Sequence, residues 1–183
     1  WFELLNWEKM LLEEAYESGE FTKDLDALID EEREVIEKLR NLAAYHILYS
    51  KINYVFRSGG YVRTDEEHAM VEEISEHPLI KGKNTAQSRR AATICFYTQG
   101  FCQWAKRDWV QSFEKFSRAK QILDDNPLIK ADLPKRYIRT LHYLIQCLIE
   151  LGRFKEARDS IKQLRALDGQ EGFAGIDIHV HIF

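Results

Sequence analysis

The sequence predicts an all-α protein, built as an α-solenoid of three to four antiparallel helical hairpins. Apolar residues recur at the 3.6-residue period of an α-helix through most of the 183 residues. Glycine, proline and helix-capping residues interrupt this pattern at short connections. Two hairpins in the second half also share one pattern of small and aromatic residues, at a spacing of 45 positions.

The first two predicted helices cover residues 1–18 and 22–58. Gly19 stands where the first would stop, and Gly59 and Gly60 end the second. The apolar stripe of the second helix is wider than the two-per-heptad seam of a coiled coil, so a helical repeat is the better interpretation. The pattern leaves open a break near Asp30.

A capping box begins the third predicted helix. The Thr64 hydroxyl can accept a hydrogen bond from the backbone N–H of Glu67, and the Glu67 carboxylate can reach back to Thr64. This helix is expected to run to about Glu76. The following residues, 77–84, read as a loop.

The second half predicts four longer helices. Asp108 is the expected N-cap of one of them, and Asp132 of another, with Pro134 in the first turn where a missing N–H has no cost. Asp125-Asn126-Pro127 is interpreted as a chain break, and the glycines in 169–175 indicate a loop. The four helices are expected at 85–106, 109–123, 132–151 and 154–167.

The hairpins of the second half carry corresponding residues. Trp109 and Phe154 each follow a predicted turn, 45 residues apart, and Ser112 and Ala157 repeat at the same spacing. Small residues let helix backbones approach closely, and the aromatic pair would fill the space at each turn. Gly100, Ser112, Ala119 and Ala157 are therefore expected where helices cross.

This register resembles the tetratricopeptide repeat family over residues 93–124 and 138–168, with a diverged hairpin at 39–76. The spacing of 45 departs from the family period of about 34 residues, so the helices or connections would be extended. The resemblance implies one right-handed domain over 1–183. Within it, residues 1–76 form an acidic helical part, 85–168 form two hairpins, and 169–183 form a tail or a truncated next element.

In this family the first helices of successive hairpins line a concave groove, which implies a non-enzymatic protein- or peptide-binding or scaffolding module. The aromatic members Tyr97, Phe101 and Trp104 share one helix face and are expected to be partly exposed. The alternative is that they pack between hairpins. A peptide with a hydrophobic anchor and an acid would suit the groove. By position, its lining residues would be Tyr97, Phe101, Trp104, Arg139, His142, Tyr143 and Gln146.

Charge is divided unevenly along the chain. Residues 1–76 hold 19 acidic and 8 basic residues, for a net charge of −11, whereas residues 77–183 hold 11 acidic and 18 basic residues, for +7. This asymmetry predicts solvated faces, and it would also allow self-association through unlike halves. The chain is acidic overall, so we do not expect a nucleic acid partner despite the local basic run Ser88-Arg89-Arg90.

The compartment and the extent of the chain are inferred from a few residues. No run approaches 18 apolar residues, so no membrane span is expected. Cys95, Cys102 and Cys147 sit in apolar helical patterns as an odd set, which favours a reducing, cytoplasmic setting. The chain begins at Trp1 and stops in an apolar run at Phe183, so we expect a piece of a longer protein.

No pattern predicts a cofactor, a metal or a catalytic site. Asp177-Ile178-His179-Val180-His181 resembles the first metal-ligand motif of amidohydrolases, but that fold needs further ligands from later strands of a longer barrel. A fragment of a metal-dependent hydrolase is thus the remote alternative. The nearer alternative is a peptide-sensing regulatory module of a larger protein. His46, on the apolar face with Leu39 and Leu42, is expected to be a core histidine.

Overall fold

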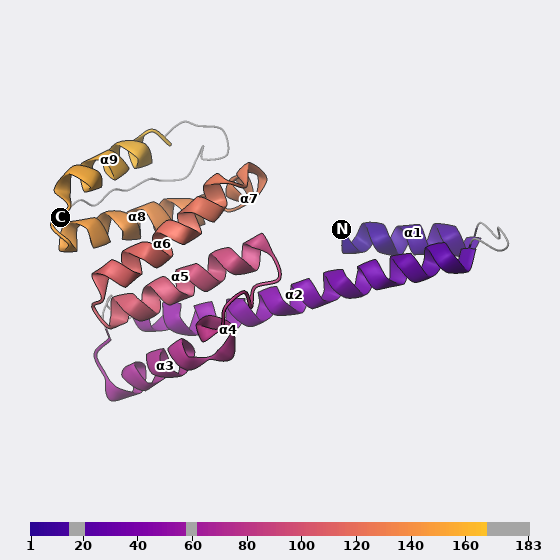
Figure 1. The fold of residues 1–183 in the computed structure, drawn as a ribbon, viewed down its shortest axis with the longest axis horizontal. Coiled ribbons are helices and arrows are strands. Elements are labelled where there is room, and N and C mark those ends of the chain that lie inside the picture. The colour runs from indigo at the N-terminus through magenta and orange to yellow at the C-terminus, as the bar shows by residue number, and fades with distance from the viewer. Residues whose placement is uncertain (15–20, 58–61, 168–183) are drawn as a thin grey trace. The chain divides into compact units, whose positions relative to one another are not determined.

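The computed structural model describes residues 1–14, 21–57 and 62–167, and every element of secondary structure in these ranges is a helix (Figure 1). The predicted all-α class is confirmed for these residues. The helices are α1 (Phe2–Glu14), α2 (Phe21–Arg57), α3 (Asp65–Glu76), α4 (Pro78–Lys81), α5 (Arg89–Ala105), α6 (Trp109–Asp124), α7 (Pro127–Asp132), α8 (Pro134–Glu150) and α9 (Phe154–Arg165).

Contacts divide the chain into two compact units, Trp1–Ala44 and Tyr45–Phe183, and the boundary lies inside α2. In the first unit α1 packs along the first part of α2. Leu5 is buried there, and the Lys9 ammonium lies 2.6 Å from the Glu32 carboxylate. That residues 1–183 behave as one domain stays a prediction.

The second unit begins with the last three turns of α2, which bury one apolar face. Tyr45, Leu48, Ile52 and Val55 are almost fully buried, at the alternating spacing of three and four that places residues on one side of a helix. His46 is exposed. The expectation of a core histidine was wrong because the buried stripe runs through Tyr45, about 100° around the helix from His46.

The longer helices of the second unit pack in sequence order, α5 on α6, α6 on α8 and α8 on α9 (Figure 1). Two predicted caps are confirmed. Thr64 and Glu67 form the capping box at the start of α3, and the Asp108 carboxylate accepts the Gln111 N–H at the start of α6. Gly152 lies in the turn between α8 and α9 and has a φ of +70°, a conformation that glycine adopts without strain.

Small residues bring α5 and α6 close together, as predicted. The Ser112 hydroxyl donates to the Gly100 carbonyl oxygen at 3.0 Å across the crossing. A Cβ atom on Gly100 would lie 2.7 Å from the Phe116 ring, so only glycine leaves room for that ring.

The two aromatic residues predicted to fill the turns differ in their burial. Trp109 packs edge-on against Trp104, with ring centres 5.0 Å apart, whereas Phe154 is 61% exposed. The expectation that Phe154 fills space at its turn was wrong, because the described helices leave that side of α9 uncovered.

Two short helices, α4 and α7, occupy segments that the sequence analysis assigned to a loop and a chain break. Both begin with the same four residues, Pro-Leu-Ile-Lys, at Pro78 and Pro127. Proline at the first position favours a helical turn there. As a consequence α5 begins at Arg89 with Ser88 as its N-cap, later than the predicted start at residue 85. Asp132, the predicted N-cap of α8, is instead the last residue of α7, and the N-cap of α8 is Leu133.

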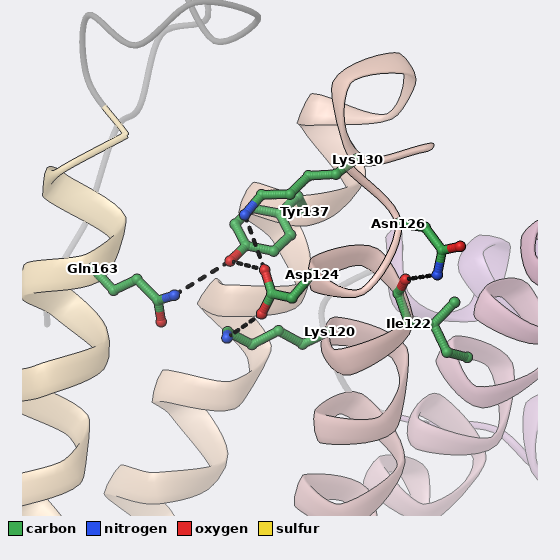
Figure 2. A network of polar contacts seen from close by, with 7 residues as sticks. All are labelled: Lys120, Ile122, Asp124, Asn126, Lys130, Tyr137 and Gln163. Atoms are coloured by element: carbon green, nitrogen blue, oxygen red, sulfur yellow. Dashed lines mark hydrogen bonds and ion pairs between the residues drawn. The ribbon is translucent and has the colours of Figure 1, made fainter. Parts of the chain in front are cut away.

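A polar network links residues of α6, α7, α8 and α9 (Figure 2). The Asp124 carboxylate accepts hydrogen bonds from the Tyr137 hydroxyl at 2.8 Å, from Lys130 at 2.9 Å and from Lys120 at 2.6 Å. The Gln163 amide donates to the Tyr137 hydroxyl at 3.3 Å. The Lys130 ammonium also lies 3.8 Å from the centre of the Tyr137 ring. One carboxylate thus holds the first turns of α8 in place beside α6.

Candidate functional site

The predicted groove aromatics on α5 are buried in an aromatic cluster. Tyr97 and Phe101 are 1% exposed and Trp104 is 6% exposed, so the expectation of an exposed strip was wrong and the alternative of packing holds. The space left by Gly100 admits the Phe116 ring from α6, and this ring lies edge-on to both Tyr97 and Phe101 with centres 5.4 Å apart. These aromatics hold helices together.

The predicted α8 residues lie next to this cluster. Tyr143 stacks on Phe116 with ring centres 5.4 Å apart and an 18° angle between planes. His142 packs edge-on against Tyr143 at 5.5 Å, and burial lowers the pKa of the His142 imidazole. Arg139 is exposed, and Gln146 is half-buried. That these residues bind a partner stays a prediction.

A cavity of about 430 Å³ lies where α2, α5 and the start of α8 meet. It contains two of the predicted residues, Tyr97 on its α5 side and Arg139 on its α8 side. The other lining residues were not predicted, because no local sequence pattern links residues from three separate helices. The volume is in the range of small-ligand sites. The lining is formed by Tyr49, Tyr97, Asp132, Leu133, Pro134, Lys135, Arg136 and Arg139.

The lining carries an excess of positive charge. Lys135, Arg136 and Arg139 contribute three cations, whereas the one acidic residue, Asp132, is paired with Arg90 from α5. Within the described residues, neither Arg136 nor Arg139 forms an ion pair with a carboxylate. Two arginines of one helix therefore face a cavity without a protein anion to neutralise them.

Arg136 is held beside the cavity by Tyr49. Its guanidinium carbon lies 5.3 Å from the centre of the Tyr49 ring, within the range of a cation–π interaction. Burial lowers the pKa of the Arg136 guanidinium, and the nearby Arg139 and Arg90 lower it further. An arginine stays protonated under these conditions. Arg136 is thus a half-buried cation beside two other arginines, without a carboxylate partner among the described residues.

Tyr97 lines the cavity, and its hydroxyl lies in an unusual environment. It is buried and has no hydrogen-bond partner among the described residues. Burial raises the pKa of this phenol well above its ordinary value, and the groups acting on it next are Tyr143, Tyr49, Arg139 and Arg136. Three of these four line or face the cavity with it. A buried hydroxyl without a partner is costly, so its position beside two arginines suggests an acceptor supplied from outside.

The N-terminus of α8 adds to the positive electrostatic potential at the cavity. Leu133, its N-cap, offers no side-chain hydrogen bond to the first turn. The N-terminus of a helix carries a partial positive charge and favours anions, yet this first turn contains Lys135 and Arg136 instead of acidic residues. Helix, side chains and Tyr97 therefore all favour a negatively charged ligand.

A second hollow of about 390 Å³ lies between α3 and the end of α5. Its charged residues include Lys106 and Glu72, which pair with each other at 2.9 Å. Because these charges are already satisfied, this hollow carries less evidence of a ligand than the α2–α5–α8 cavity. Its lining is Val62, His68, Val71, Glu72, Ala105, Lys106 and Arg107.

Groups that catalysis could use are placed unfavourably in the described residues. Cys95, Cys102 and Cys147 are unpaired and buried, and burial raises the pKa of each thiol, that of Cys147 to about 11. Reactive cysteines need the opposite shift. No three His, Cys, Asp or Glu side chains converge as metal ligands within the described ranges. Asp177, His179 and His181 lie outside them.

None of the helices in the part of the chain that is described is both long and apolar enough to cross a membrane. Comparison with protein-family models, with curated proteins and with solved structures finds no match to this chain.

Proposed function

We propose that this chain is a non-enzymatic protein- or peptide-binding module. It is an α-solenoid of helical hairpins, similar to tetratricopeptide repeats, with a Pro-Leu-Ile-Lys turn inserted between successive hairpins. The packing of α5, α6, α8 and α9 in sequence order supports the solenoid. The close α5–α6 crossing at Gly100 and Ser112 supports the resemblance.

The observation that carries the binding function is the cavity between α2, α5 and α8. Among the residues that the structure describes, it combines two arginines that lack a carboxylate partner with a buried Tyr97 hydroxyl that lacks a hydrogen-bond partner. A partner segment with an acidic group could satisfy all three. The Tyr49 ring and the apolar residues Leu133 and Pro134 in the lining provide a surface for the hydrophobic part of the same segment.

The proposal is tested with fluorescent decapeptides that carry Asp or Glu between leucines, and with matched peptides that carry Lys. Fluorescence anisotropy should show binding of the acidic set. Arg139→Gln should weaken it by about tenfold, which corresponds to about 1.4 kcal/mol. Arg158, exposed on α9 away from the cavity lining, gives the matched control, and Arg158→Gln should leave binding unchanged. Equal binding of acidic and basic peptides, or no effect of Arg139→Gln, would overturn the proposal.

A further inference from the structure

The cavity contains more hydrogen-bond donors than a single carboxylate can use. Tyr97 reaches it from α5, and Arg136 and Arg139 reach it from successive turns of α8. A guanidinium offers up to five N–H donors, and it binds phosphate or carboxylate through two of them at once. Two guanidinium groups and a hydroxyl that approach from two helices suit an acceptor with oxygens in three directions. A tetrahedral phosphate has this shape, whereas a carboxylate is planar and has two oxygens.

The charge of the site also favours a dianion. Asp132 is neutralised by Arg90, so Lys135, Arg136 and Arg139 leave an excess of about three positive charges. A phosphate monoester carries between 1.5 and 2 negative charges at neutral pH, more than any single side chain of an unmodified peptide. The α8 N-terminus, which lacks a side-chain cap, adds a further preference for concentrated negative charge.

The Tyr97 hydroxyl is the independent sign that a ligand completes this site. A helix N-terminus with basic residues is common on protein surfaces. A buried phenol that has no partner among the described residues, on a side chain that lines the same cavity, is a second and different observation. Removal of the Tyr97 hydroxyl should raise the free energy of unfolding of the free protein. An acceptor that enters from solution would account for the presence of this hydroxyl.

From these observations, and resting on the proposed peptide-binding function, we infer that the acidic group recognised in the α2–α5–α8 cavity is the phosphate of a phosphorylated side chain. Arg136 and Arg139 form ion pairs with its oxygens, and Tyr97 donates a hydrogen bond to the most deeply inserted one. The Tyr49 ring lies against the stem of the side chain. No covalent change occurs in the ligand.

The test uses the full chain and three fluorescent decapeptides that differ at one central position: phosphoserine, glutamate or serine, each flanked by leucines. The phosphoserine peptide should bind about tenfold more tightly than the glutamate peptide. Arg136→Gln and Arg139→Gln should each remove that difference, and Tyr97→Phe should reduce it severalfold while it raises the thermal midpoint of the free protein. Arg139 is exposed, so its variant keeps the test valid if the half-buried Arg136 is needed for folding.

Each other outcome is decisive. Glutamate and phosphoserine peptides that bind equally would overturn the phosphate inference and leave the proposed function standing. Preferential phosphoserine binding that survives both arginine variants would place the phosphate elsewhere and overturn the site. Binding of inorganic phosphate, measured by titration calorimetry, without binding of any peptide would show a free-anion site and overturn the phosphorylated side chain as ligand. If no peptide and no phosphate binds the folded protein, the inference and the proposed function both fail.

Discussion

Two buried tyrosines of the second unit differ in what their hydroxyl groups reach. The Tyr45 hydroxyl donates to the Leu79 carbonyl oxygen at 2.9 Å and lies 2.6 Å from the Thr85 hydroxyl. It thereby ties α2 to the short helix α4, and burial raises its pKa to about 12. The Tyr97 hydroxyl is equally buried but has no partner in the described part of the chain. One phenol therefore ties two elements of the fold together, and the other has no such partner in the described residues.

This contrast gives a matched pair of substitutions. Tyr97→Phe should raise the free energy of unfolding by about 1 kcal/mol, because it removes a buried hydroxyl that has no partner among the described residues. Tyr45→Phe should lower it by about 1 kcal/mol, because it leaves the Leu79 carbonyl without this donor. Urea unfolding of the two variants beside the parent measures both. A loss of stability in Tyr97→Phe as large as that in Tyr45→Phe would mean that Tyr97 has a structural partner.

At the scale of helices, the capping residues could be predicted from the sequence. Which helix faces are buried by other helices could not. The caps at Thr64 and Asp108 depend on neighbours three residues away, so the sequence predicted them. Which face of α5 is covered depends on Phe116 and Tyr143 from other helices, so the exposure of Trp104 was mispredicted. Proline was read as a break at 127, although the recurrence of Pro-Leu-Ile-Lys was a visible signal of a repeated turn.

The α5–α6 crossing should be intolerant of even one methyl group. Alanine normally replaces glycine inside a helix with a gain of about 0.5–1 kcal/mol. At Gly100 the new Cβ would meet the Phe116 ring at 2.7 Å, and overpacking of this kind costs about 1–3 kcal/mol. Gly100→Ala should thus be destabilising in thermal or urea unfolding. Phe116→Leu in the same chain should absorb part of that loss, and strict additivity of the two changes would contradict the predicted clash.

The network at Asp124 makes the junction of α6, α7 and α8 sensitive to acid. Partial burial would raise the pKa of this carboxyl, but hydrogen bonds from Lys120, Lys130 and Tyr137 outweigh it and the net shift is downward. A carboxyl with a lowered pKa contributes stability above its unfolded value, about 3.9, and loses it as pH falls through the lower folded value. The free energy of unfolding should accordingly decrease from about pH 5 downward.

Asp124→Asn tests this assignment. The variant should unfold about 1–3 kcal/mol more easily at neutral pH, and its stability should decline less steeply below pH 5 than that of the parent. Asp159→Asn is the control, since Asp159 is an exposed carboxylate on α9 whose partner among the described residues is Lys162, at 3.4 Å. Parallel pH profiles for the parent and Asp124→Asn would show that the network does not depend on the charge of Asp124.

At the scale of the molecule, the cavity exists only once distant parts of the chain are stacked. Tyr49 and Arg136 are far apart in sequence, and neither is singled out by a motif. The sequence placed Tyr97 and Arg139 on the first helices of two predicted hairpins, and both residues line the cavity. That this surface binds a partner stays a prediction. Self-association between the acidic half of one copy and the basic half of another stays a prediction, and such contact would compete for the same arginines.

The most direct measurement is a crystal structure of the chain with a bound acidic or phosphorylated decapeptide. We expect the acidic group to lie in the α2–α5–α8 cavity, within hydrogen-bond distance, about 3 Å, of the Tyr97 hydroxyl and of the Arg136 guanidinium. The apolar part of the peptide should rest against Tyr49 and Leu133. A peptide bound at the hollow lined by His68 and Glu72, with Tyr97 still without a partner, would contradict the account.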